Sequence, residues 1–375
     1  MKSDVFAIGD YIISPLGMGS DINFKQVLDG QTAIAPIDDP ALSSHRIHAA
    51  RISGDSLPGK QENEKRYTRL ERLFIATIQG LIEAFDIPTD KRTLVVLSTT
   101  KGNVSLLGDP GAAFPTQRIY ISKMAYEIQR YFGFENQLIT VSNACISGSL
   151  ALSVARQLLQ HNSTYEQAIA VGGDELSKFI VSGFEAFQAL ADEPCRPFDR
   201  DRKGLNLGEA VAAVYLSKIP AEGAVRLVGV GSFNDANHIS GPSRTGEGLY
   251  RSVRRAMHEA GEPTLDFISA HGTATAYNDE MEAMALHRSG LTAVPLHSLK
   301  GYYGHTLGAS GLLETILAMH SLRSNRLIPS LGFKHQGTSH PLNISTERST
   351  QPLATFLKTA SGFGGCNIAT VFQKI

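Results

Sequence analysis

The apolar positions of the chain fall into two kinds of stretch that alternate along its length. Short apolar runs bounded by turn residues predict buried strands, and longer segments with apolar residues three and four positions apart predict helices. The predicted strands cover residues 4–14, 94–98, 137–142, 167–173, 208–218, 225–233, 265–270, 294–299, 355–361 and 368–373. The predicted helices cover residues 24–28, 63–85, 122–132, 146–159, 250–260, 281–288 and 308–322. This alternation predicts an α/β fold in which helices cover the sheets.

The stretch from 137 to 159 stands out because a cysteine lies between its strand and its helix. Residues 137–142 form a predicted buried strand, Cys145 follows, and the next helix is apolar on nearly every face, which is typical of a buried helix. The helix macrodipole favours an anion at this position, so we expect a lowered thiol pKa. The free amides of the first helical turn are suited to hold an oxyanion. The alternative is a small cysteine that only packs.

The second half of the chain repeats this arrangement. Lys300 and His305 follow the predicted strand 294–299 and precede a helix that, like the one after Cys145, begins with small residues. The order of elements is therefore compatible with an internal duplication. A chain of 375 residues is too long for one simple core, and residues 220–224 (PAEGA) are the best candidate boundary. We expect an N-terminal half, residues 1–220, with the cysteine and a C-terminal half, residues 221–375, with the histidines.

Composition excludes several classes of function. The chain has 42% hydrophobic and 19% charged residues, and 35 basic against 36 acidic residues give a formal net charge of -1. There is no overall field to recruit nucleic acid or an anionic membrane. Three cysteines without metal-ligand spacing indicate a reducing compartment and no disulfide framework. Because no signal-peptide pattern and no bilayer-length apolar run is found, the expected location is the cytoplasm.

Three segments of the second half carry candidate chemistry at the ends of predicted elements. His271 stands where a strand enters a glycine-containing turn, the place where α/β sheets expose functional groups. Lys300 follows an apolar strand, so its burial requires a partner, and Glu314 is the candidate. The glycines of residues 361–367 (SGFGGCN) permit close approach of backbone to a ligand. The alternatives are a capping histidine, a surface lysine and a plain hairpin turn.

One cysteine and two histidines at strand ends indicate a thiolate that carries an acyl group beside two imidazoles. Such imidazoles can stabilise an enolate formed beside a thioester by donating hydrogen bonds to its oxygen. Serine-hydrolase, P-loop, dinucleotide-binding and zinc patterns are absent from the sequence, so no metal site is expected.

These residues match a known family over nearly the whole chain. The chain resembles the β-ketoacyl-acyl carrier protein synthases of the thiolase superfamily, in the elongating branch with a Cys-His-His site. The matching segments are residues 143–145 (NAC), 196–204 (RPFDRDRKG) with Gly208 and Glu209, 235–238 (DANH) with Pro242, 271–275 (HGTAT) with Asn278 and Asp279, Lys300 with Gly304 and His305, and 362–365 (GFGG). The resemblance implies a thiolase-like α/β fold of two related halves, each with a mixed sheet, layered α-β-α-β-α.

The resemblance also implies a catalytic role for each matching residue. Cys145 takes the growing acyl chain as a thioester. His271 and His305 hold the malonyl thioester of the carrier protein and promote its decarboxylation, and Lys300 orients the site with Glu314. The implied reaction is a decarboxylative Claisen condensation that extends a fatty-acid- or polyene-type chain by two carbons.

The glycine-rich segment near the C-terminus completes the implied site. The amides of Cys145 and Phe363 form the oxyanion hole, and Phe363 is also the gate beside the thiol. The supporting residues are Thr273, Thr275 and Gly364. Phosphopantetheine thioesters of the carrier protein are the substrates, so the resemblance implies no further cofactor.

The sequence departs from the family pattern at two positions in these segments. Ala274 stands where the family usually has glycine, and Ile146 stands where a small residue or serine is commoner, which we expect to reshape the acyl pocket. Residues 98–102 (STTKG) and 142–146 (SNACI) are more similar to synthases of aryl-polyene or flexirubin-type pigment clusters.

The implied partners are an acyl carrier protein and a second synthase chain, in a homodimer or a heterodimer. Carrier proteins are acidic, and Lys65, Arg69 and Arg72 share one side of the predicted helix 63–85, so we expect a docking face there, with Arg202 in the same role. The alternative is a solvated charged face. The runner-up function is a non-catalytic chain-length partner in a heterodimer, which typically lacks the nucleophile.

Overall fold

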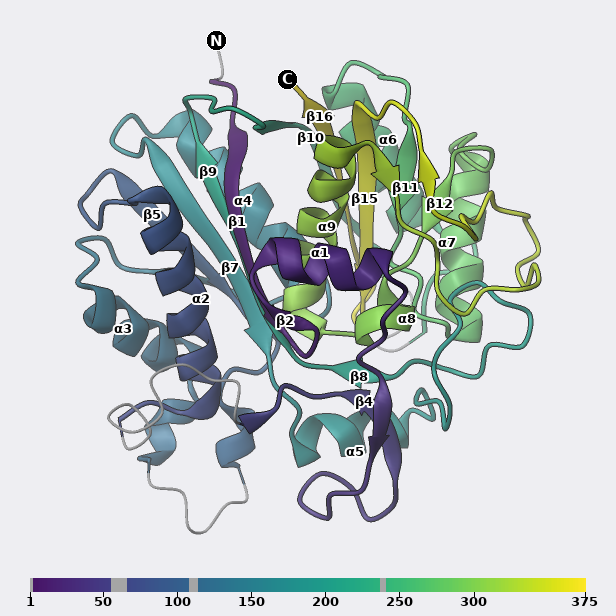
Figure 1. Cartoon of the computed structure of the whole chain (residues 1–375), viewed down its shortest axis with the longest axis horizontal. Helices are drawn as coiled ribbons and strands as arrows, with labels where there is room; N and C mark the ends of the chain where they lie inside the picture. Colours follow the sequence, from purple (N-terminus) through teal and green to yellow (C-terminus); the bar gives the residue numbers. More distant parts are fainter. Residues whose placement is uncertain (1–2, 55–65, 108–113, 237–240) are drawn as a thin grey trace.

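The computed structural model describes residues 3–54, 66–107, 114–236 and 241–375 (Figure 1). One large mixed sheet runs through the molecule in the order β12-β11-β15-β16-β10-β1-β9-β7-β5-β6. Its strands from the first half are β1 (Phe6–Ser14), β5 (Thr93–Ser98), β6 (Ile139–Val141), β7 (Gln167–Asp174) and β9 (Ala210–Ser217). Its strands from the second half are β10 (Val225–Asn234), β11 (Phe267–Ser269), β12 (Leu296–His297), β15 (Thr355–Gly362) and β16 (Cys366–Lys374).

The two halves of this sheet have the same topology. When the five strands of each half are numbered in chain order, both halves read 3-2-4-5-1 from the outer edge inward. The first three strands in this order are parallel to one another, and the next two are antiparallel to their neighbours, in both halves. The shared topology supports the internal duplication that the order of elements indicated.

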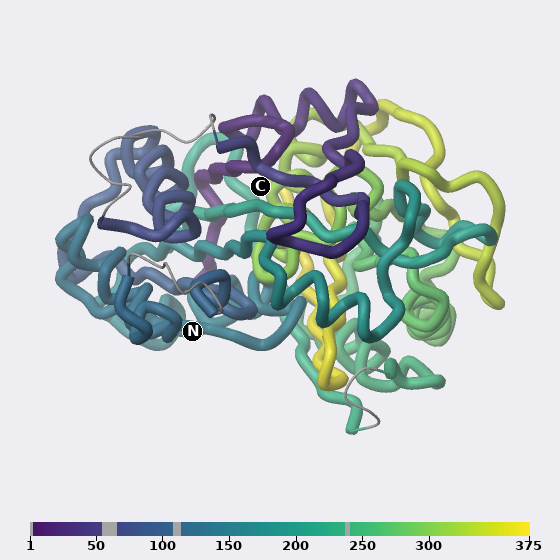
Figure 2. Tube along the Cα trace, turned by 90° about the horizontal axis from the view of Figure 1, so that it is seen from below, coloured from purple at the N-terminus to yellow at the C-terminus, as the bar shows by residue number. Residues whose placement is uncertain are grey.

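The halves are joined because β1 pairs with β10, with Phe6 opposite Arg226 and Ala7 opposite Val225. The division into domains at residue 220 therefore stays a prediction, since one hydrogen-bonded sheet crosses it. Figure 2 shows most of the N-terminal half on one side of the molecule and most of the C-terminal half on the other.

The helices form three layers around the two halves of the sheet (Figure 1). Their bounds are α1 (Ser20–Leu28), α2 (Arg69–Phe85), α3 (Ile121–Phe132), α4 (Ser147–His161), α5 (Lys178–Ala186), α6 (Glu247–Glu259), α7 (Ala276–Arg288), α8 (Lys300–Tyr303) and α9 (Ser310–Ser324). Helix α2 packs on β1, β7 and β9, and α6 packs on β10 and β16. Helices α4 and α9 pack against each other between the two halves of the sheet. The result is the expected α-β-α-β-α layering.

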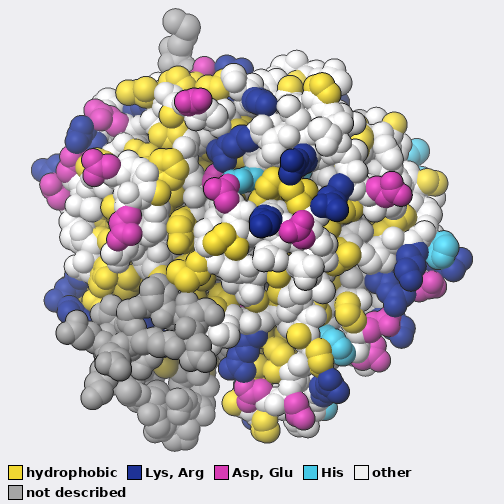
Figure 3. All heavy atoms as spheres, viewed as in Figure 1, with side chains coloured by type: hydrophobic (Ala, Val, Ile, Leu, Met, Phe, Trp, Pro, Cys, Tyr) yellow, Lys and Arg dark blue, Asp and Glu magenta, His cyan; other side chains and the backbone are white. Residues whose placement is uncertain are grey.

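Short elements complete the fold. Strand β2 (Gly17–Met18) pairs with β1, a three-stranded sheet contains β3 (Ala35–Ile37), β4 (Ile47–Ala50) and β8 (Leu207–Gly208), and β13 (Arg326–Leu327) pairs with β14 (Ser349–Thr350). The 3₁₀ helices that the described residues contain in full are η2 (Val104–Leu106), η3 (Thr116–Ile119) and η4 (Leu307–Ala309). Basic and acidic side chains are interspersed over the face in Figure 3, in line with the near-zero net charge.

The strands that are covered on both faces consist of apolar and small residues. All residues of β5 and β9 are buried, because helices pack on both sides of them. Strand β6 differs from its prediction as a buried strand. Among the described strands it lies at the edge of the sheet and pairs with β5 alone, and Thr140 is exposed.

Helix α2 begins later than its periodicity predicts. Thr68 caps it by accepting a hydrogen bond from the Glu71 amide, and the Glu71 carboxylate accepts one from the Thr68 amide. This capping box fixes Arg69 as the first helical residue. The predicted start near residue 63 is wrong for residues 66–68, which precede the helix. Lys65 lies outside the described residues.

Candidate active site

Cys145 occupies a sharp turn between β6 and α4. Ala144 adopts a left-handed conformation with φ of 44°, and Ser147 closes the turn, because its hydroxyl accepts from the Asn143 amide at 2.8 Å and donates to the Ala144 carbonyl at 2.6 Å. Helix α4 begins at Ser147, so the thiol lies just before its N-terminus. Cys145 is 7% exposed and lines a pocket.

The expected direction of the Cys145 pKa is wrong. Burial raises the pKa of this thiol to about 12, neighbouring Cys366 adds to the rise, and Lys300 opposes it. The sequence shows the helix terminus but not the depth of burial, and burial disfavours the charged thiolate. The resting site therefore holds a neutral thiol.

Small residues at the starts of α4 and α9 bring the two functional segments together. A Cβ at Gly148 would lie 2.7 Å from the Gly308 carbonyl oxygen, and a Cβ at Gly311 would lie 2.4 Å from the Ser149 amide nitrogen. Larger side chains would separate the two central helices at the end where Cys145 and His305 lie. The glycines that the sequence shows after each reactive residue thus have a packing role.

His305 is held at its backbone and at one ring nitrogen. Its amide donates to the Asn206 carbonyl at 2.7 Å, and its carbonyl accepts from the Gly208 amide at 3.0 Å. Nδ1 lies 3.0 Å from the Ser310 hydroxyl. Nε2 is buried and has no hydrogen-bond partner among the described residues, so it is available to a substrate.

His271 projects from the end of β11 on a loop that two carboxylates of α7 hold. Glu282 accepts from the amides of His271 at 2.9 Å and Gly272 at 2.8 Å, and Asp279 accepts from the Thr273 amide at 2.9 Å. Burial raises the pKa of Asp279 to about 6. The sequence places Asp279 in a segment that matches the family, but only the fold shows that Asp279 and Glu282 together fix the histidine loop.

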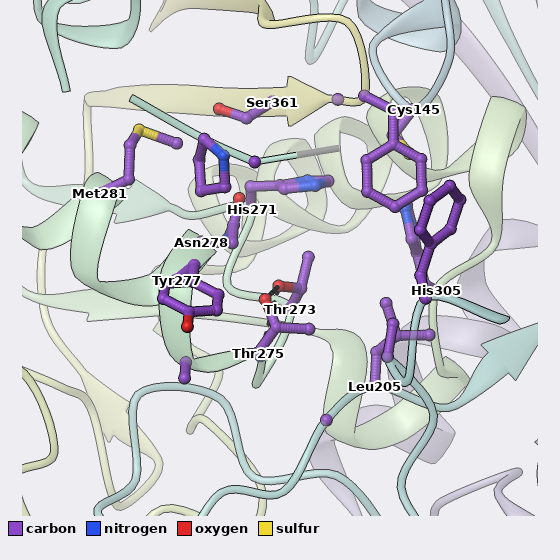
Figure 4. A pocket seen from close by; sticks show the side chains of 18 of the residues that line it. Cys145, Leu205, His271, Thr273, Thr275, Tyr277, Asn278, Met281, His305 and Ser361 are labelled. Carbon is purple, nitrogen blue, oxygen red and sulfur yellow. Dashed lines mark hydrogen bonds between the residues drawn. The ribbon is translucent and has the colours of Figure 1, made fainter. Parts of the chain in front are cut away.

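The two imidazoles lie edge to face, with 5.3 Å between ring centroids. Burial, together with the positive charges of Lys300 and Lys358, holds the pKa of both His271 and His305 well below the ordinary range. Both rings are therefore neutral near pH 7 and have N–H groups to donate. Figure 4 shows Cys145, His271 and His305 converging on one end of the pocket.

Lys300 is buried and paired with the partner that the sequence suggests. Its Nζ lies 2.5 Å from Glu314 Oε1, at the start of α8 rather than on the surface. A second buried lysine, Lys358, lies 2.6 Å from Glu314 Oε2. Sequence reasoning missed Lys358, although a lysine in an apolar strand is the signal that marked Lys300.

Aromatic side chains line the same pocket as the thiol. The ring of Phe363 lies 5.5 Å from that of Phe184 and 5.2 Å from that of Phe187, centroid to centroid. The turn that carries Phe363 touches the nucleophile, since a Cβ at Gly362 would lie 3.0 Å from the Cys145 amide nitrogen. Gly364 has a φ of 86° and is exposed at the tip of this turn. Phe184 belongs to α5, which the sequence analysis did not predict.

The pocket in front of these groups has a volume of about 480 Å³ and two kinds of wall. Phe184, Phe187 and Met281 contribute apolar side chains. Thr273 and Thr275 contribute hydroxyls that lie 2.9 Å apart. An apolar chain attached to a polar, amide-rich arm fits such a lining.

The two departures from the family pattern have structural correlates. Ala274 adopts a φ of 63°, a left-handed conformation that glycine takes without strain. Ile146 is buried in a cluster with Ala360, Cys366 and Ile368. It is not among the described residues that line the pocket, so any effect on the acyl pocket would be indirect and stays a prediction.

The proposed docking residues do not form an exposed face in the described structure. Arg69 lies 2.8 Å from Glu209 and 3.2 Å from Glu175, and it donates to the Ile52 carbonyl at 2.8 Å. Arg69 therefore holds α2 to buried carboxylates, while its side chain is still 26% exposed, so its docking role stays a prediction. Arg72 is half-buried one turn further along α2.

Arg202 is likewise part of the pocket wall. Its guanidinium donates to the carbonyls of Asp199 at 2.8 Å, Gly337 at 2.6 Å and Ala276 at 3.2 Å, and its side chain is 9% exposed. Its N–H groups already have internal acceptors, and its docking role stays a prediction.

Neither a metal-binding cluster nor a membrane-spanning helix is found in the part of the chain that the structure describes. In this part of the chain no group of three or more His, Cys, Asp or Glu side chains is arranged to hold a metal ion. Helices with the length and hydrophobicity to cross a bilayer are also lacking there. The three cysteines are free thiols.

Comparisons with known proteins place the chain in a family. A model of the β-ketoacyl synthase N-terminal domain matches residues 2–220, and one of the C-terminal domain matches residues 224–334. A putative mitochondrial 3-oxoacyl-[acyl-carrier-protein] synthase of Schizosaccharomyces pombe is 26% identical over 418 residues, covering 96% of this chain and 97% of the relative. The 3-oxoacyl-[acyl-carrier-protein] synthase 2 of Rhizobium meliloti is 26% identical over 419 residues, covering 99% and 98%.

A solved structure has the same fold over the whole chain. The ketosynthase ApeO in complex with its chain length factor ApeC, from Xenorhabdus doucetiae, matches with a TM-score of 0.89 at 24% identity, covering 100% of this chain and 98% of that one. This likeness confirms the predicted thiolase-like fold. Since the N-terminal model alone matches more than half of the chain, the chain belongs to the β-ketoacyl synthase family and is an acyltransferase of that family.

Proposed function

We propose that this enzyme condenses an acyl group bound to Cys145 with a malonyl thioester on an acyl carrier protein, and so extends the chain by two carbons. The observation that carries this proposal is the convergence of one buried thiol and two neutral imidazoles on one pocket. The carrier protein as substrate is supported by the names of the relatives, which are synthases acting on it.

In the first step Cys145 Sγ attacks the carbonyl carbon of the acyl-carrier thioester. A C–S bond to the enzyme forms, the bond to the phosphopantetheine sulfur breaks, and the departing thiolate takes up the proton that Cys145 loses. The raised pKa of Cys145 means that proton loss accompanies the attack rather than preceding it. The amides of Cys145 and Phe363 are our candidates for the groups that stabilise the oxyanion.

In the second step the malonyl thioester loses carbon dioxide, and the electron pair of the broken C–C bond moves onto the thioester oxygen as an enolate. Neutral His271 and His305 donate hydrogen bonds to this oxygen. The enolate carbon then attacks the acyl carbonyl on Cys145, a C–C bond forms, and the Cys145 sulfur leaves. Thr273 and Thr275, whose side chains line the pocket, are our candidates for binding the amides of the phosphopantetheine arm.

The test separates decarboxylation from condensation. Cys145→Gln removes the nucleophile while its amide resembles an acylated thiol, so we expect carbon dioxide release from malonyl-carrier protein without any lengthened product. Wild-type enzyme should give both, with the product two carbons longer by mass spectrometry. Lengthened product from Cys145→Gln would refute the proposal.

A non-catalytic chain-length partner is the second candidate function. The neighbouring ketosynthase ApeO forms a complex with such a partner. Retention of Cys145 inside the pocket favours the catalytic role for this chain. The partner role would apply if the chain by itself had no acyl transfer activity and changed product length when mixed with a second synthase.

We propose further that the enzyme is cytoplasmic and acts in a pigment pathway of the aryl-polyene or flexirubin type. The free cysteines agree with a reducing compartment. The pathway assignment rests on the similarity of residues 98–102 and 142–146 to synthases of those clusters. A panel of carrier-bound acyl groups, assayed by mass spectrometry, tests it, and a preference for saturated fatty acyl groups would contradict it.

A further inference from the structure

Lys358 is a buried lysine that has no part in the steps proposed above. Its Nζ lies 2.6 Å from Glu314 Oε2, while Lys300 Nζ lies 2.5 Å from Glu314 Oε1. Both lysines are fully buried, so two ammonium groups share one carboxylate inside the protein. The three side chains together carry one net positive charge, which is costly to bury.

Lys358 also binds the strand end from which His271 projects. Its Nζ donates to the carbonyls of Ser269 at 3.2 Å, Ala270 at 3.4 Å and Thr359 at 2.6 Å. Ser269 is the last residue of β11 and pairs with Lys358 in the sheet, and Ala270 directly precedes His271. Lys358 therefore ties the base of the histidine loop to β15.

The charged and titratable groups around the two imidazoles come from several elements. They are Lys300 on α8, Glu314 on α9, Lys358 on β15, Asp279 and Glu282 on α7, His297 on β12 and Cys145 before α4. The Glu282 carboxylate accepts from the amides of His271 and Gly272 and from the Thr359 hydroxyl. The two lysines are the cations that lower the pKa of both imidazoles.

We propose that Lys358 is a positioning residue for the condensation, which acts with Lys300 through the shared carboxylate of Glu314 to fix His271 and to keep both imidazoles uncharged. The proposal rests on the proposed function, because uncharged imidazoles matter there as hydrogen-bond donors to the enolate. Burial lowers the pKa of Lys358 itself, and Glu314 opposes this. Burial also raises the pKa of Glu314, but the two lysines more than offset it, so the carboxylate stays charged.

The experiment compares pH profiles of kcat for carbon dioxide release from malonyl-carrier protein. Lys358→Met removes the charge and the hydrogen bonds, Lys358→Gln removes the charge and keeps an N–H donor, and Lys358→Arg keeps the charge. In Lys358→Met and Lys358→Gln we expect the acid limb of the profile to shift to higher pH by on the order of one pH unit. At a fixed pH on that limb, this shift is about a tenfold loss of kcat. KM should change little, and Lys358→Arg should restore the wild-type limb.

Lys374→Met is the matched control, because it makes the same change on exposed β16 residue Lys374, outside the site. Its profile should overlay that of the wild type. An unmoved acid limb in a folded Lys358→Met or Lys358→Gln variant would overturn the proposal, as would a uniform loss of kcat at every pH.

Imidazole titration by NMR supplies a readout that needs no substrate. Assigned with His271→Gln and His305→Gln, both rings of wild-type enzyme should stay neutral down to pH 5, and both should titrate at higher pH in Lys358→Gln. Rings that titrate at ordinary values in the wild type would refute the proposal even if every Lys358 variant failed to fold. A wild type without decarboxylation but with this titration behaviour would refute only the proposed function.

Discussion

His297 is a residue whose burial makes folding stability depend on pH. It is fully buried on β12, both ring nitrogens lack hydrogen-bond partners among the described residues, and its ring lies 5.6 Å from that of Phe267. Burial lowers the pKa of His297 to about 3, Lys358 adds to this, and Glu314 opposes it. Below about pH 6.5, His297 is therefore neutral in the folded chain and protonated in the unfolded chain, until the pH approaches 3.

The sign follows from this depressed folded-state pKa. The contribution of His297 to the free energy of unfolding is full above about pH 6.5 and is lost as pH falls from there toward 3. Between pH 7 and pH 5 the loss is about 2 kcal/mol. In His297→Phe this loss is absent, so the variant should gain about 2 kcal/mol relative to the wild type over that interval.

Urea unfolding of both proteins at pH 7 and pH 5 measures this difference. Phenylalanine also changes packing, but that change adds the same offset at both pH values. Groups with raised pKa, such as Asp279, titrate in both proteins and cancel. A difference between the two proteins that does not change with pH would contradict a neutral, unpartnered His297.

At the scale of single residues, the sequence predicts which residues form the site better than it predicts their protonation. Cys145, His271, His305 and Lys300 were selected from their places at element ends, and the structure brings them to one site. The thiol pKa could not be predicted, because burial arises from segments far away in the chain. Lys358 could have been identified from the sequence, because a lysine within an apolar strand is buried and then needs a charged partner.

At the scale of elements, Arg69 is the residue on which the start of α2 depends. Its guanidinium pairs with Glu209 and Glu175, whose side chains are almost fully buried. Arg69→Ala leaves both carboxylates without this cation, so we expect a loss of about 3 kcal/mol in the free energy of unfolding. Arg66→Ala, three residues earlier at an exposed position, is the control and should cost less than about 1 kcal/mol.

Chemical denaturation of the two variants checks this prediction. If Arg69→Ala were as stable as Arg66→Ala, the ion pairs would contribute little to the free energy of unfolding. That result would contradict a structural role for Arg69. The capping box at Thr68 and Glu71 is a signal that the sequence contains, as T-x-x-E, and it would have predicted the correct start of α2.

At the scale of the whole molecule, β6 leaves an edge of the large sheet open. Its residues are only partly buried, and Thr140 is exposed. An uncovered apolar edge strand is a site for pairing with another chain. We therefore predict a dimer at micromolar concentration, formed through this edge.

Sedimentation of a matched pair of variants tests the dimer. Thr140→Glu places like charges face to face across a two-fold axis and should shift the chain toward monomer. Thr164→Glu, at another exposed threonine away from this edge, should leave the dimer intact. A monomeric wild type, or a Thr140→Glu variant that stays as dimeric as the wild type, would contradict pairing through β6.

The alternation of strands and helices was enough to predict the layered α/β fold, because each period is a local property of the chain. The pairing of β1 with β10, which joins the halves into one sheet, was not predictable in this way, since it connects segments more than two hundred residues apart. For the same reason, the sequence does not predict that Phe184 of α5 packs on Phe363 and lines the pocket that contains Cys145.

The central claim is that Cys145 carries the acyl group during elongation, and loading followed by chase tests it most directly. Wild-type enzyme is incubated with an acyl-carrier thioester, digested and analysed by mass spectrometry, before and after addition of malonyl-carrier protein. We predict an acyl adduct on the peptide that contains Cys145 and its disappearance as a product two carbons longer forms. Cys195→Ala and Cys366→Ala should load normally, and Cys145→Ala should not. An adduct on another residue, or elongation by Cys145→Ala, would contradict the account.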